Sequence, residues 1–426
     1  MRAMTACRIC FIRPLVGRRV AHGLLVFAIL SSALAVAMGQ GTGRPGTHQS
    51  GTNVRFENAR NSITIPFEGE NLIILPVRVN NSAPMRFLFD TGAGMSVLAA
   101  QTAAKLKLKK ADDLDARGVG GTVQGFLAKG VSLSMGGVTV RNLPVAVLPL
   151  DFPCELSDIA GIIGYEFIKE FVVEIDYESK TMSFSNPQTY QYTGHGDLLP
   201  VELTGNTPRI RARIDLAGAP PQEGIFEIDT GSDGALTVNS PFIKKHSLLS
   251  LLGAKVDSVH RGAGGESKSV DARIRKFEIG RYVIAEPLVT FSEAREGVHA
   301  ARDNDGPIGN EILRRFRIVL DYSRRRMMFE PNTHLSDPLD AGMSGIEFDP
   351  DDCGLSKIVK VEENSAADKA GIRAGDVIVA INGRPLSEFN SMQIEKLLAQ
   401  HGAEHSLTLN RGGKTVIVKI KLSRLM

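Results

Sequence analysis

The segments "FLFDTGAGMSVL" at residues 87–98 and "FEIDTGSDGALTV" at residues 226–238 each place Asp-Thr-Gly at the end of an apolar, strand-like run. A single Asp-Thr-Gly in a glycine-rich chain is consistent with a tight turn and nothing more. Its recurrence in the same sequence context favours a different interpretation. We therefore ask whether the chain contains two copies of one folding unit.

Further landmarks follow each triplet in the same order. A helix-compatible run, "AAQTAAKLKL" or "SPFIKKHSLL", precedes a glycine turn, "RGVGGT" at 117–122 or "RGAGGE" at 261–266. Each copy closes with a related segment, "GIIGYEFIKEFVVEIDY" at 161–177 or "GPIGNEILRRFRIVLDY" at 306–322. Ordered matches of this kind predict a duplicated unit of domain size. The short runs of Val, Ile, Leu and Phe between turn residues predict mostly β structure with one or two short helices per copy.

Two aspartates brought together by such a duplication have a specific chemical capacity. Carboxyl groups about 3 Å apart cannot both ionise, so they share one proton. One then acts as a base and the other as an acid in the same pH range. Asp90 and Asp229 could thus activate a water molecule for attack on a peptide carbonyl.

The residues next to each aspartate suit this task. Glycine lets a loop turn tightly, and a threonine hydroxyl can bond to the opposite loop and fix the carboxylate separation. The predicted supporting residues are Thr91, Gly92, Thr230, Gly231 and Ser232. The position after the triplet is Ala93 in the first copy and Ser232 in the second. Because a hydroxyl donor favours a charged carboxylate, we expect Asp229 to be the more readily ionised aspartate.

With these motifs, the chain between residues 60 and 331 resembles the aspartic proteases of the pepsin/retropepsin type. That family follows each Asp-Thr/Ser-Gly loop with an apolar pair and a glycine, as in "GIIG" at 161–164 and "GPIG" at 306–309. The resemblance implies a mostly β fold of two acid-protease β-barrel lobes related by a pseudo-twofold axis. It also implies that Asp90 and Asp229 are the catalytic dyad, that the substrate is a polypeptide, and that no cofactor or metal is needed.

The flaps depart from the pepsin pattern. Pepsin-like enzymes have a flap tyrosine in the first lobe, and no tyrosine lies between Asp90 and Gly161. Glycine turns occur in both halves instead, which is closer to retropepsins and predicts two flaps that close over substrate. The predicted flap glycines are Gly118, Gly120, Gly121, Gly262, Gly264 and Gly265. Arg117 and Arg261 beside them are either ion-pair partners in the flap stems or solvated surface residues.

The C-terminal region carries a second resemblance. "NSAADKAGIRAGDVIVAINGRPL" at 364–386 is similar to bacterial PDZ domains, which bind an extended peptide between a strand and a helix. The amphipathic run at 391–401 is the expected helix. We place the loop that receives a peptide carboxylate at Gly354, Leu355 and Ser356, although the usual Gly-Leu-Gly-Phe is absent. A module that only caps the structure is the alternative.

The first 39 residues predict export. They contain five arginines and no acidic residue, and they end in the apolar run "GLLVFAILSSALAVAMG" at 23–39. This is the pattern of a cleaved export signal, although an uncleaved membrane anchor is an alternative. The chain has a formal charge of +3, so the remainder is close to neutral. No basic stripe predicts a nucleic-acid partner, and no stable membrane span is expected after cleavage. Cys154 and Cys353 remain, and the sequence leaves open whether they pair.

These observations predict an exported, periplasmic or extracellular endopeptidase of the aspartic type with a PDZ domain that binds peptide or substrate C-termini. The alternative is a non-catalytic envelope protein that keeps the protease fold and binds peptides. The predicted organisation is an export signal at 1–39, a flexible linker at 40–60, lobe 1 at 61–190, lobe 2 at 191–331, a linker at 332–341 and the PDZ domain at 342–426.

Overall fold

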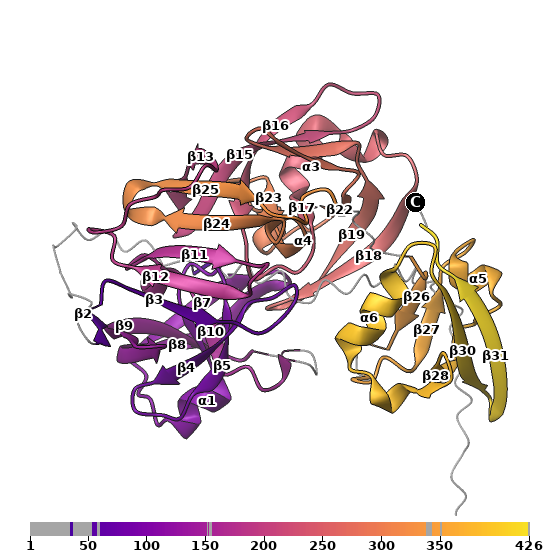
Figure 1. The fold of residues 1–426 in the computed structure, drawn as a ribbon, viewed down its shortest axis with the longest axis horizontal. Coiled ribbons are helices and arrows are strands. Elements are labelled where there is room, and N and C mark those ends of the chain that lie inside the picture. Colours follow the sequence, from indigo (N-terminus) through magenta and orange to yellow (C-terminus); the bar gives the residue numbers. More distant parts are fainter. Residues whose placement is uncertain are drawn as a thin grey trace, which may run out of the picture.

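The computed structural model describes residues 35–36, 53–57, 60–150, 152, 156–337, 343–349 and 352–424. They form two β-rich lobes and a smaller C-terminal module beside them (Figure 1). Strands account for 48% of the structure and helices for 13%, so the predicted mostly β, two-lobed fold is confirmed. Most of the predicted export signal and linker lies outside the described residues. The exceptions in the signal are Ala35–Val36, which form β1 and pair with β7.

The first lobe is built on a nine-stranded sheet with the order β1-β7-β8-β4-β5-β10-β6-β9-β2. Alternating apolar residues explain its strands: in β4, Leu75, Val77 and Val79 are buried, whereas Pro76 and Arg78 are exposed. One face of the sheet therefore packs into the core. The strands are β2 (Asn53–Phe56), β4 (Ile74–Val79), β5 (Met85–Phe89), β6 (Val97–Ala99), β7 (Asp112–Gly118), β8 (Gly121–Met135), β9 (Val138–Leu148) and β10 (Gly161–Ile163).

The second lobe repeats this arrangement with its own sheet, in the order β18-β19-β22-β17-β23-β16-β15-β20-β21, and β14 pairs with β15. In both lobes a short buried strand, β10 or β23, runs parallel to the strand that leads to Asp-Thr-Gly. The strands are β14 (Glu202–Thr204), β15 (Thr207–Asp215), β16 (Gln222–Ile228), β17 (Leu236–Val238), β18 (Lys255–Gly262), β19 (Gly265–Arg273), β20 (Lys276–Ile279), β21 (Tyr282–Ala285), β22 (Leu288–Ser292) and β23 (Gly306–Ile308).

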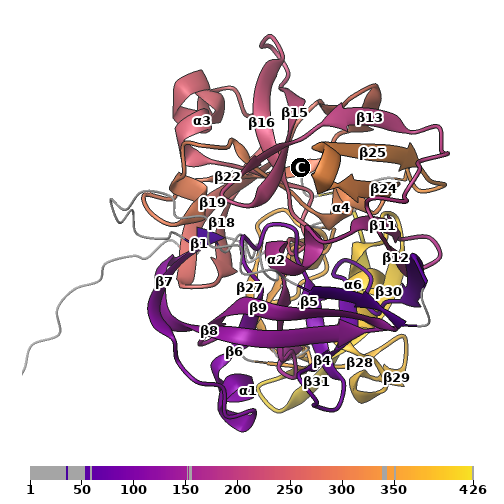
Figure 2. The same cartoon turned by 90° about the vertical axis from the view of Figure 1, so that its left-hand side faces the viewer.

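A six-stranded sheet joins the two lobes, in the order β13-β25-β24-β11-β12-β3. Each lobe contributes three strands, and β11 and β24 pair antiparallel at the junction, with Glu174 opposite Val319. Figure 2 shows these two strands where the lobes meet. The order is symmetric about this pair, as a pseudo-twofold axis requires. The strands are β3 (Ser62–Pro66), β11 (Val172–Asp176), β12 (Thr181–Ser185), β13 (Asp197–Pro200), β24 (Phe316–Asp321) and β25 (Arg326–Pro331).

Short helices follow equivalent strands in the two lobes. The runs predicted to be helical form α1 (Ala100–Lys105) and α3 (Ser240–His246), and two further helices, α2 (Tyr165–Ile168) and α4 (Asn310–Leu313), follow β10 and β23. The 3₁₀ turns of the lobes are η3 (Leu248–Ser250), η4 (Val298–Ala300) and η5 (Tyr322–Arg324). No helix among the described residues is long and apolar enough to cross a membrane.

The C-terminal module has a separate apolar core. Its helix α6 begins with a capping box between Asn390 and Gln393, and its last two strands, β30 and β31, form an antiparallel hairpin. Cys353 is disulfide-bonded, and its partner, like Cys154, lies outside the described residues. The elements are β26 (Ile346–Phe348), β27 (Ile358–Val361), α5 (Ala366–Lys369), β28 (Val377–Ile381), β29 (Arg384–Pro385), η6 (Leu386–Glu388), α6 (Ser391–Ala399), β30 (Glu404–Arg411) and β31 (Lys414–Lys421).

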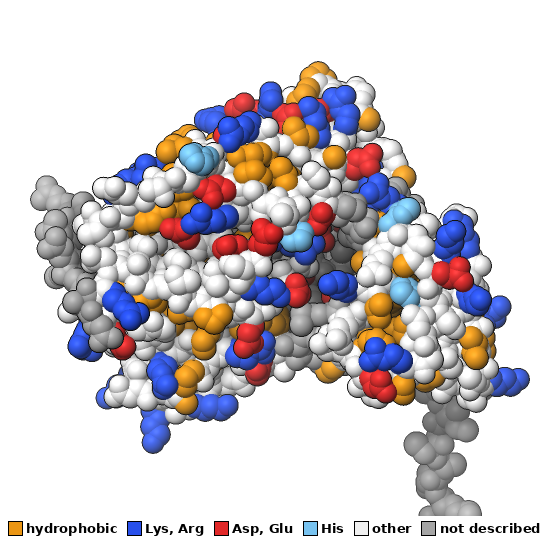
Figure 3. Space-filling model, in the orientation of Figure 1, with side chains coloured by type: hydrophobic (Ala, Val, Ile, Leu, Met, Phe, Trp, Pro, Cys, Tyr) orange, Lys and Arg blue, Asp and Glu red, His pale blue; other side chains and the backbone are white. Residues whose placement is uncertain are grey.

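The surface shown in Figure 3 mixes charges of both signs. Lys and Arg side chains alternate with Asp and Glu side chains over this face, and neither sign gathers into one large patch. Many of them are ion-paired across neighbouring strands, as Arg317 of β24 is with Glu174 of β11 and Glu330 of β25. Most of these pairs are partly exposed, so they contribute little to stability.

Candidate active site

The two aspartates occupy equivalent positions, one in each lobe. Asp90 follows β5 and Asp229 follows β16, and both side chains are fully buried. The backbone N–H of Asp90 donates to the carbonyl of Ile163 at 3.0 Å, and that of Asp229 donates to the carbonyl of Ile308 at 3.0 Å. The "GIIG" and "GPIG" segments therefore support the two loops directly. Each hydrogen bond extends a parallel strand pair, β10 with β5 or β23 with β16.

Hydrogen bonds between the threonines lock the two loops together. The N–H of Thr91 donates to the hydroxyl of Thr230 at 3.1 Å, and the N–H of Thr230 donates to the hydroxyl of Thr91 at 3.0 Å. Each hydroxyl in turn donates to a strand carbonyl of the other lobe, Thr91 to Ile228 at 2.5 Å and Thr230 to Phe89 at 3.0 Å. Four buried hydrogen bonds thus fix the relative position of the two aspartates.

The loop glycines bring backbone against the carboxylates. A Cβ atom at position 92 would lie 2.7 Å from Oδ1 of Asp229, so only glycine fits there. The N–H of Gly92 donates to Oδ1 of its own Asp90 at 2.8 Å, and that of Gly231 donates to Oδ1 of Asp229 at 2.9 Å. The first loop therefore reaches the second aspartate, and the two carboxyl groups lie in one site.

Burial and mutual repulsion make the pair share a proton. Burial, the charge of Asp90 and a side-chain hydrogen bond to Asp90 raise the pKa of Asp229 well above its usual value. Ser232 lowers the pKa of Asp229 through its backbone N–H, and this effect is smaller than that of burial. The two carboxyl groups titrate as a pair, so the expectation that Asp229 is the more readily ionised aspartate stays a prediction.

The predicted flap glycines lie at the tips of two hairpins. Gly118 pairs with Gly121 between β7 and β8, and Gly262 pairs with Gly265 between β18 and β19. The tips touch: the N–H of Gly120 donates to the carbonyl of Ala263 at 3.1 Å. Gly264 also packs on the first tip, since a Cβ atom there would lie 3.0 Å from the carbonyl oxygen of Gly121. The tips of the two flaps, one from each lobe, are therefore in direct backbone contact.

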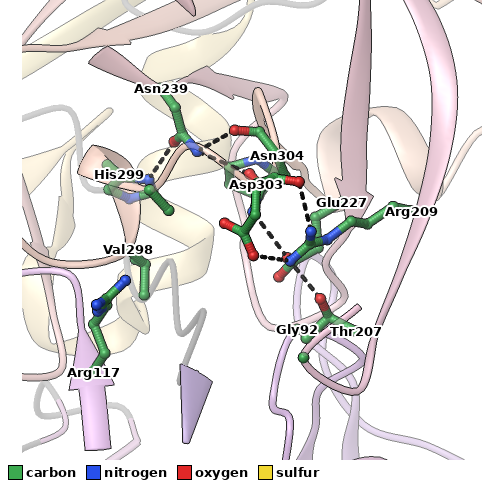
Figure 4. A pocket seen from close by; sticks show the side chains of 13 residues that line it. Gly92, Arg117, Thr207, Arg209, Glu227, Asn239, Val298, His299, Asp303 and Asn304 are labelled. Atoms are coloured by element: carbon green, nitrogen blue, oxygen red, sulfur yellow. Dashed lines mark hydrogen bonds and ion pairs between the residues drawn. The ribbon is translucent and has the colours of Figure 1, made fainter. Parts of the chain in front are cut away.

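One pocket beside the dyad contains charged residues that the sequence analysis missed (Figure 4). Arg209 and Glu227 face each other on β15 and β16 and are each 4% exposed. Both Nη atoms of Arg209 donate to Asp303, one to the backbone carbonyl at 2.6 Å and one to the carboxylate at 2.9 Å. Oε2 of Glu227 accepts from Thr207 at 2.8 Å. In the sequence, the only signal was a glutamate at the position where the first copy has Leu88.

Glu227 lies two residues before Asp229 and belongs to its electrostatic environment. Burial, reinforced by the charge of Asp229 and opposed by that of Arg209, raises the pKa of Glu227 to about 8. Burial therefore favours the neutral form of this carboxyl group.

The predicted carboxylate-binding loop of the C-terminal module already holds a carboxylate. Gly354, Leu355 and Ser356 lie in the turn between β26 and β27. There Asp352 accepts hydrogen bonds from the N–H groups of Gly354 at 3.1 Å, Ser356 at 2.8 Å and Lys357 at 2.7 Å. These donors are satisfied within the turn. Among the described residues, β26 pairs only with β27, which leaves its other edge open.

Among the described residues, no group of three or more His, Cys, Asp or Glu side chains is arranged to hold a metal ion. The acidic groups that the structure brings together are the aspartate pair and Glu227. The chemistry that their arrangement supports is proton transfer between carboxyl groups and a substrate.

Two stretches of the chain match families of known proteins. Residues 75–167 match the aspartyl protease family, and residues 357–411 match the PDZ domain family. The second match confirms the predicted C-terminal PDZ domain, and the first indicates a peptidase. A crystal structure of the aspartic proteinase from Irpex lacteus is 14% identical, with a TM-score of 0.42, and the similarity covers 65% of this chain and 99% of that one.

Curated relatives share only a small part of the chain. The periplasmic serine endoprotease DegP of Salmonella typhimurium is 40% identical over 67 residues, which is 16% of this chain and 14% of that protein. DegP of Escherichia coli is 35% identical over 94 residues, which is 20% of this chain and 19% of that protein. A probable periplasmic serine protease of Haemophilus influenzae is 43% identical over 65 residues, 15% of this chain and 14% of the relative. The chain spans less than a fifth of these relatives.

Proposed function

We propose that the protein is an exported endopeptidase of the aspartic type, in which Asp90 and Asp229 activate a water molecule for peptide hydrolysis. The observation that carries the proposal is the buried pair of threonines, which fixes two carboxyl groups in one site where they share a proton. The match of residues 75–167 to the aspartyl protease family supports it.

Asp90 is the base in the first step. Its Oδ1 accepts N–H bonds from Gly92 at 2.8 Å and Ala93 at 3.1 Å, which stabilise its negative charge. Asp90 takes a proton from the attacking water while the water oxygen bonds to the substrate carbonyl carbon. Asp229 gives its proton to the carbonyl oxygen, so the tetrahedral intermediate forms without a free oxyanion.

The second step returns the protons. Asp90 gives its proton to the leaving nitrogen, the C–N bond breaks, and Asp229 recovers a proton from a hydroxyl of the intermediate. The products are a carboxylic acid and an amine, and the dyad again holds one proton. The two aspartates need not move between the steps, because the threonine bonds hold both Asp-Thr-Gly loops in place.

Export and peptide recruitment complete the proposal. The arginine-rich start followed by an apolar run supports export, and the similar proteins named above are periplasmic. The open edge of β26 offers a position where a peptide C-terminus pairs as an additional strand. Peptides with free and amidated C-termini, titrated into the protein, test this: Ile346→Pro in β26 should weaken binding of the free C-terminus.

Cleavage assays test the catalytic proposal. The mature protein should cut an unfolded polypeptide, and Asp90→Asn and Asp229→Asn should each abolish cleavage, because either variant removes one of the two proton-transfer groups. Circular dichroism should show that both variants are folded. If the wild-type protein binds unfolded polypeptide but releases it intact, the protein is a peptide-binding protein with a protease fold, and the proposal is wrong.

A further inference from the structure

The two lobes differ in the strand pair that flanks the dyad. In the first lobe, Ile74 of β4 pairs with Leu88 of β5. In the second lobe, the equivalent pair is Arg209 of β15 with Glu227 of β16. Leu88 and Glu227 each precede the catalytic aspartate by two residues. The duplication therefore places an apolar pair on one side of the dyad and a buried Arg–Glu pair on the other.

The neighbouring positions follow the same division. Leu88 lies in an apolar cluster that includes Leu72, Ile74 and Ile162. At the equivalent positions the second lobe has Thr207, Arg209 and Pro307, which line the pocket together with Glu227. Buried polar and charged groups are costly unless they are paired and fully hydrogen-bonded. Only the second lobe has polar and charged residues where the first lobe has an apolar cluster, which favours a role of this pair in binding.

The pocket lies next to the dyad and is lined in part by a flap residue. It has a volume of about 70 Å³ and is lined by Gly92 of the first catalytic loop and by Arg117 of the first flap. Figure 4 shows Arg117 on the opposite side of the pocket from Arg209 and Glu227. A space of about two water volumes takes a small head group. A substrate side chain next to the scissile bond is the group that such a position would receive.

The polar groups of the pocket can donate hydrogen bonds to a ligand that carries an acceptor. Nε of Arg209 and Oε1 of Glu227 are buried and have no hydrogen-bond partner among the described residues. Nε of Arg209 lies 3.8 Å from Oε2 of Glu227, which is beyond hydrogen-bond distance. Arg117 is exposed and forms no ion pair with any described residue. With Glu227 neutral, as burial favours, the charges of Arg117 and Arg209 exceed the single charge of Asp303. The pocket then carries net positive charge and can donate from Arg209, Glu227 and Arg117.

We propose that this pocket is the substrate subsite on the second-lobe side of the scissile bond, and that it selects a side chain ending in a carboxylate or a carboxamide. The inference rests on the proposed peptidase function, because it names the substrates of that site. A carboxylate should bind more tightly than a carboxamide because of the charges of the two arginines. Both should bind more tightly than an apolar side chain, which would leave Arg209 and Glu227 without hydrogen-bond partners.

Peptide libraries varied at the positions flanking the cut test the inference. The wild-type protein should cleave peptides with Glu or Gln at one flanking position about tenfold faster, as kcat/KM, than peptides with Leu there. The double variant Arg209→Ile with Glu227→Leu copies the first lobe and should reverse this preference. The matched control is Arg211→Ile with Glu223→Leu, which removes an exposed ion pair from the same two strands and should keep the wild-type profile.

Binding separates the inference from the proposed function. Asp90→Asn should not cleave, yet it should bind the Glu and Gln peptides about tenfold more tightly than the Leu peptide, and Arg117→Met should reduce the preference for Glu over Gln. Equal affinities, or a cleavage profile unchanged by the double variant, would overturn the subsite and leave the peptidase in place. Selective binding without any cleavage by the wild-type protein would remove the peptidase and keep the site.

Discussion

Thr91 and Thr230 each donate a backbone N–H to the other's hydroxyl, at 3.1 and 3.0 Å, across the junction of the two lobes. The exchange joins two loops whose aspartates come from different halves of the chain. Because each hydroxyl also donates to a strand carbonyl of the opposite lobe, a change in either loop is transmitted to the other. The separation of the carboxyl groups is thus a property of the interface between the lobes.

Thr230→Val should therefore damage both stability and activity. The variant leaves the N–H of Thr91 and the carbonyl of Phe89 buried without their partner, which costs about 2–4 kcal/mol in the free energy of unfolding. Urea unfolding and kcat/KM measure the two effects. Thr230→Ser keeps the hydroxyl and is the matched control. Equal stability and activity of the Val and Ser variants would show that the hydroxyl does not hold the loops.

The stability of the protein should depend on pH through Glu227. Its folded-state pKa is raised to about 8 from 4.5, so the folded protein binds this proton more tightly than the unfolded chain does. The stabilisation is complete below about pH 4.5 and is lost as the pH rises towards 8. Glu227→Gln, which mimics the neutral acid, should match the wild-type protein in acid and exceed its stability above pH 8.

Thermal unfolding of both proteins across this range measures the effect. The difference at high pH should reach at least about 1.4 kcal/mol, the equivalent of one pKa unit. Glu223→Gln, at an exposed site on the same strand, is the control and should show no such difference. A wild-type protein that is as stable as Glu227→Gln above pH 8 would mean that Glu227 is ionised at no cost.

The sequence predicted the dyad because its signals are local and repeated. Asp90 and Asp229 end strands that need a buried neighbour, and the "GIIG" and "GPIG" segments supply that neighbour in each copy. The same order of motifs in two copies indicates a twofold arrangement, in which equivalent loops meet at the axis. The positions of Thr91 and Thr230 across from each other follow from that arrangement alone.

The other features of the site depend on contacts between residues far apart in the sequence, which no local sequence pattern predicts. Arg209 and Glu227 alternate with apolar residues along their strands, which is typical of a solvent-facing side, and only the assembled lobes bury them. Burial outweighs the donor from Ser232 in its effect on the pKa of Asp229. In the PDZ domain, Asp352 takes the N–H groups that the sequence assigned to a peptide, and nothing in the motif indicates this.

Acidification should loosen the flaps through two histidines. His260 of β18 and His299 of η4 are buried with their ring centroids 5.4 Å apart, and the adjacent Val298 packs on Val119 at the first flap tip. Burial lowers the pKa of His260 to about 4, and burial and the charge of His260 lower that of His299 to about 3. The folded protein therefore binds these protons more weakly than the unfolded chain does.

The closed flaps should be fully stable above about pH 6.5, the usual pKa of histidine, and should lose stability as the pH falls towards 4 and then 3. Hydrogen exchange of residues 255–273, corrected for the intrinsic effect of pH, measures this. His260→Gln should reduce the dependence, whereas His195→Gln, at an exposed site, should not. Exchange that is independent of pH in the wild-type protein would contradict the role of the pair.

The flap junction should control turnover with little effect on overall stability. The N–H of Gly120 donates to Ala263, and a Cβ atom at position 120 would lie 2.3 Å from the carbonyl oxygen of Gly264. Gly120→Ala therefore forces the two tips apart. Because closure of flaps over substrate completes an active site of this kind, kcat/KM should fall about tenfold, while the free energy of unfolding changes by less than about 0.5 kcal/mol.

Gly253→Ala is the matched control, since a Cβ atom there would meet nothing within 4 Å and the backbone needs no left-handed conformation. It should leave both measurements unchanged. Hydrogen exchange at the tips should rise in Gly120→Ala alone, because that variant loses the bond to Ala263. If Gly120→Ala cleaves peptides at the wild-type rate with its tips exchanging faster, the tips do not need to touch for catalysis, and the pocket beside Arg117 must be closed by the flap strand itself.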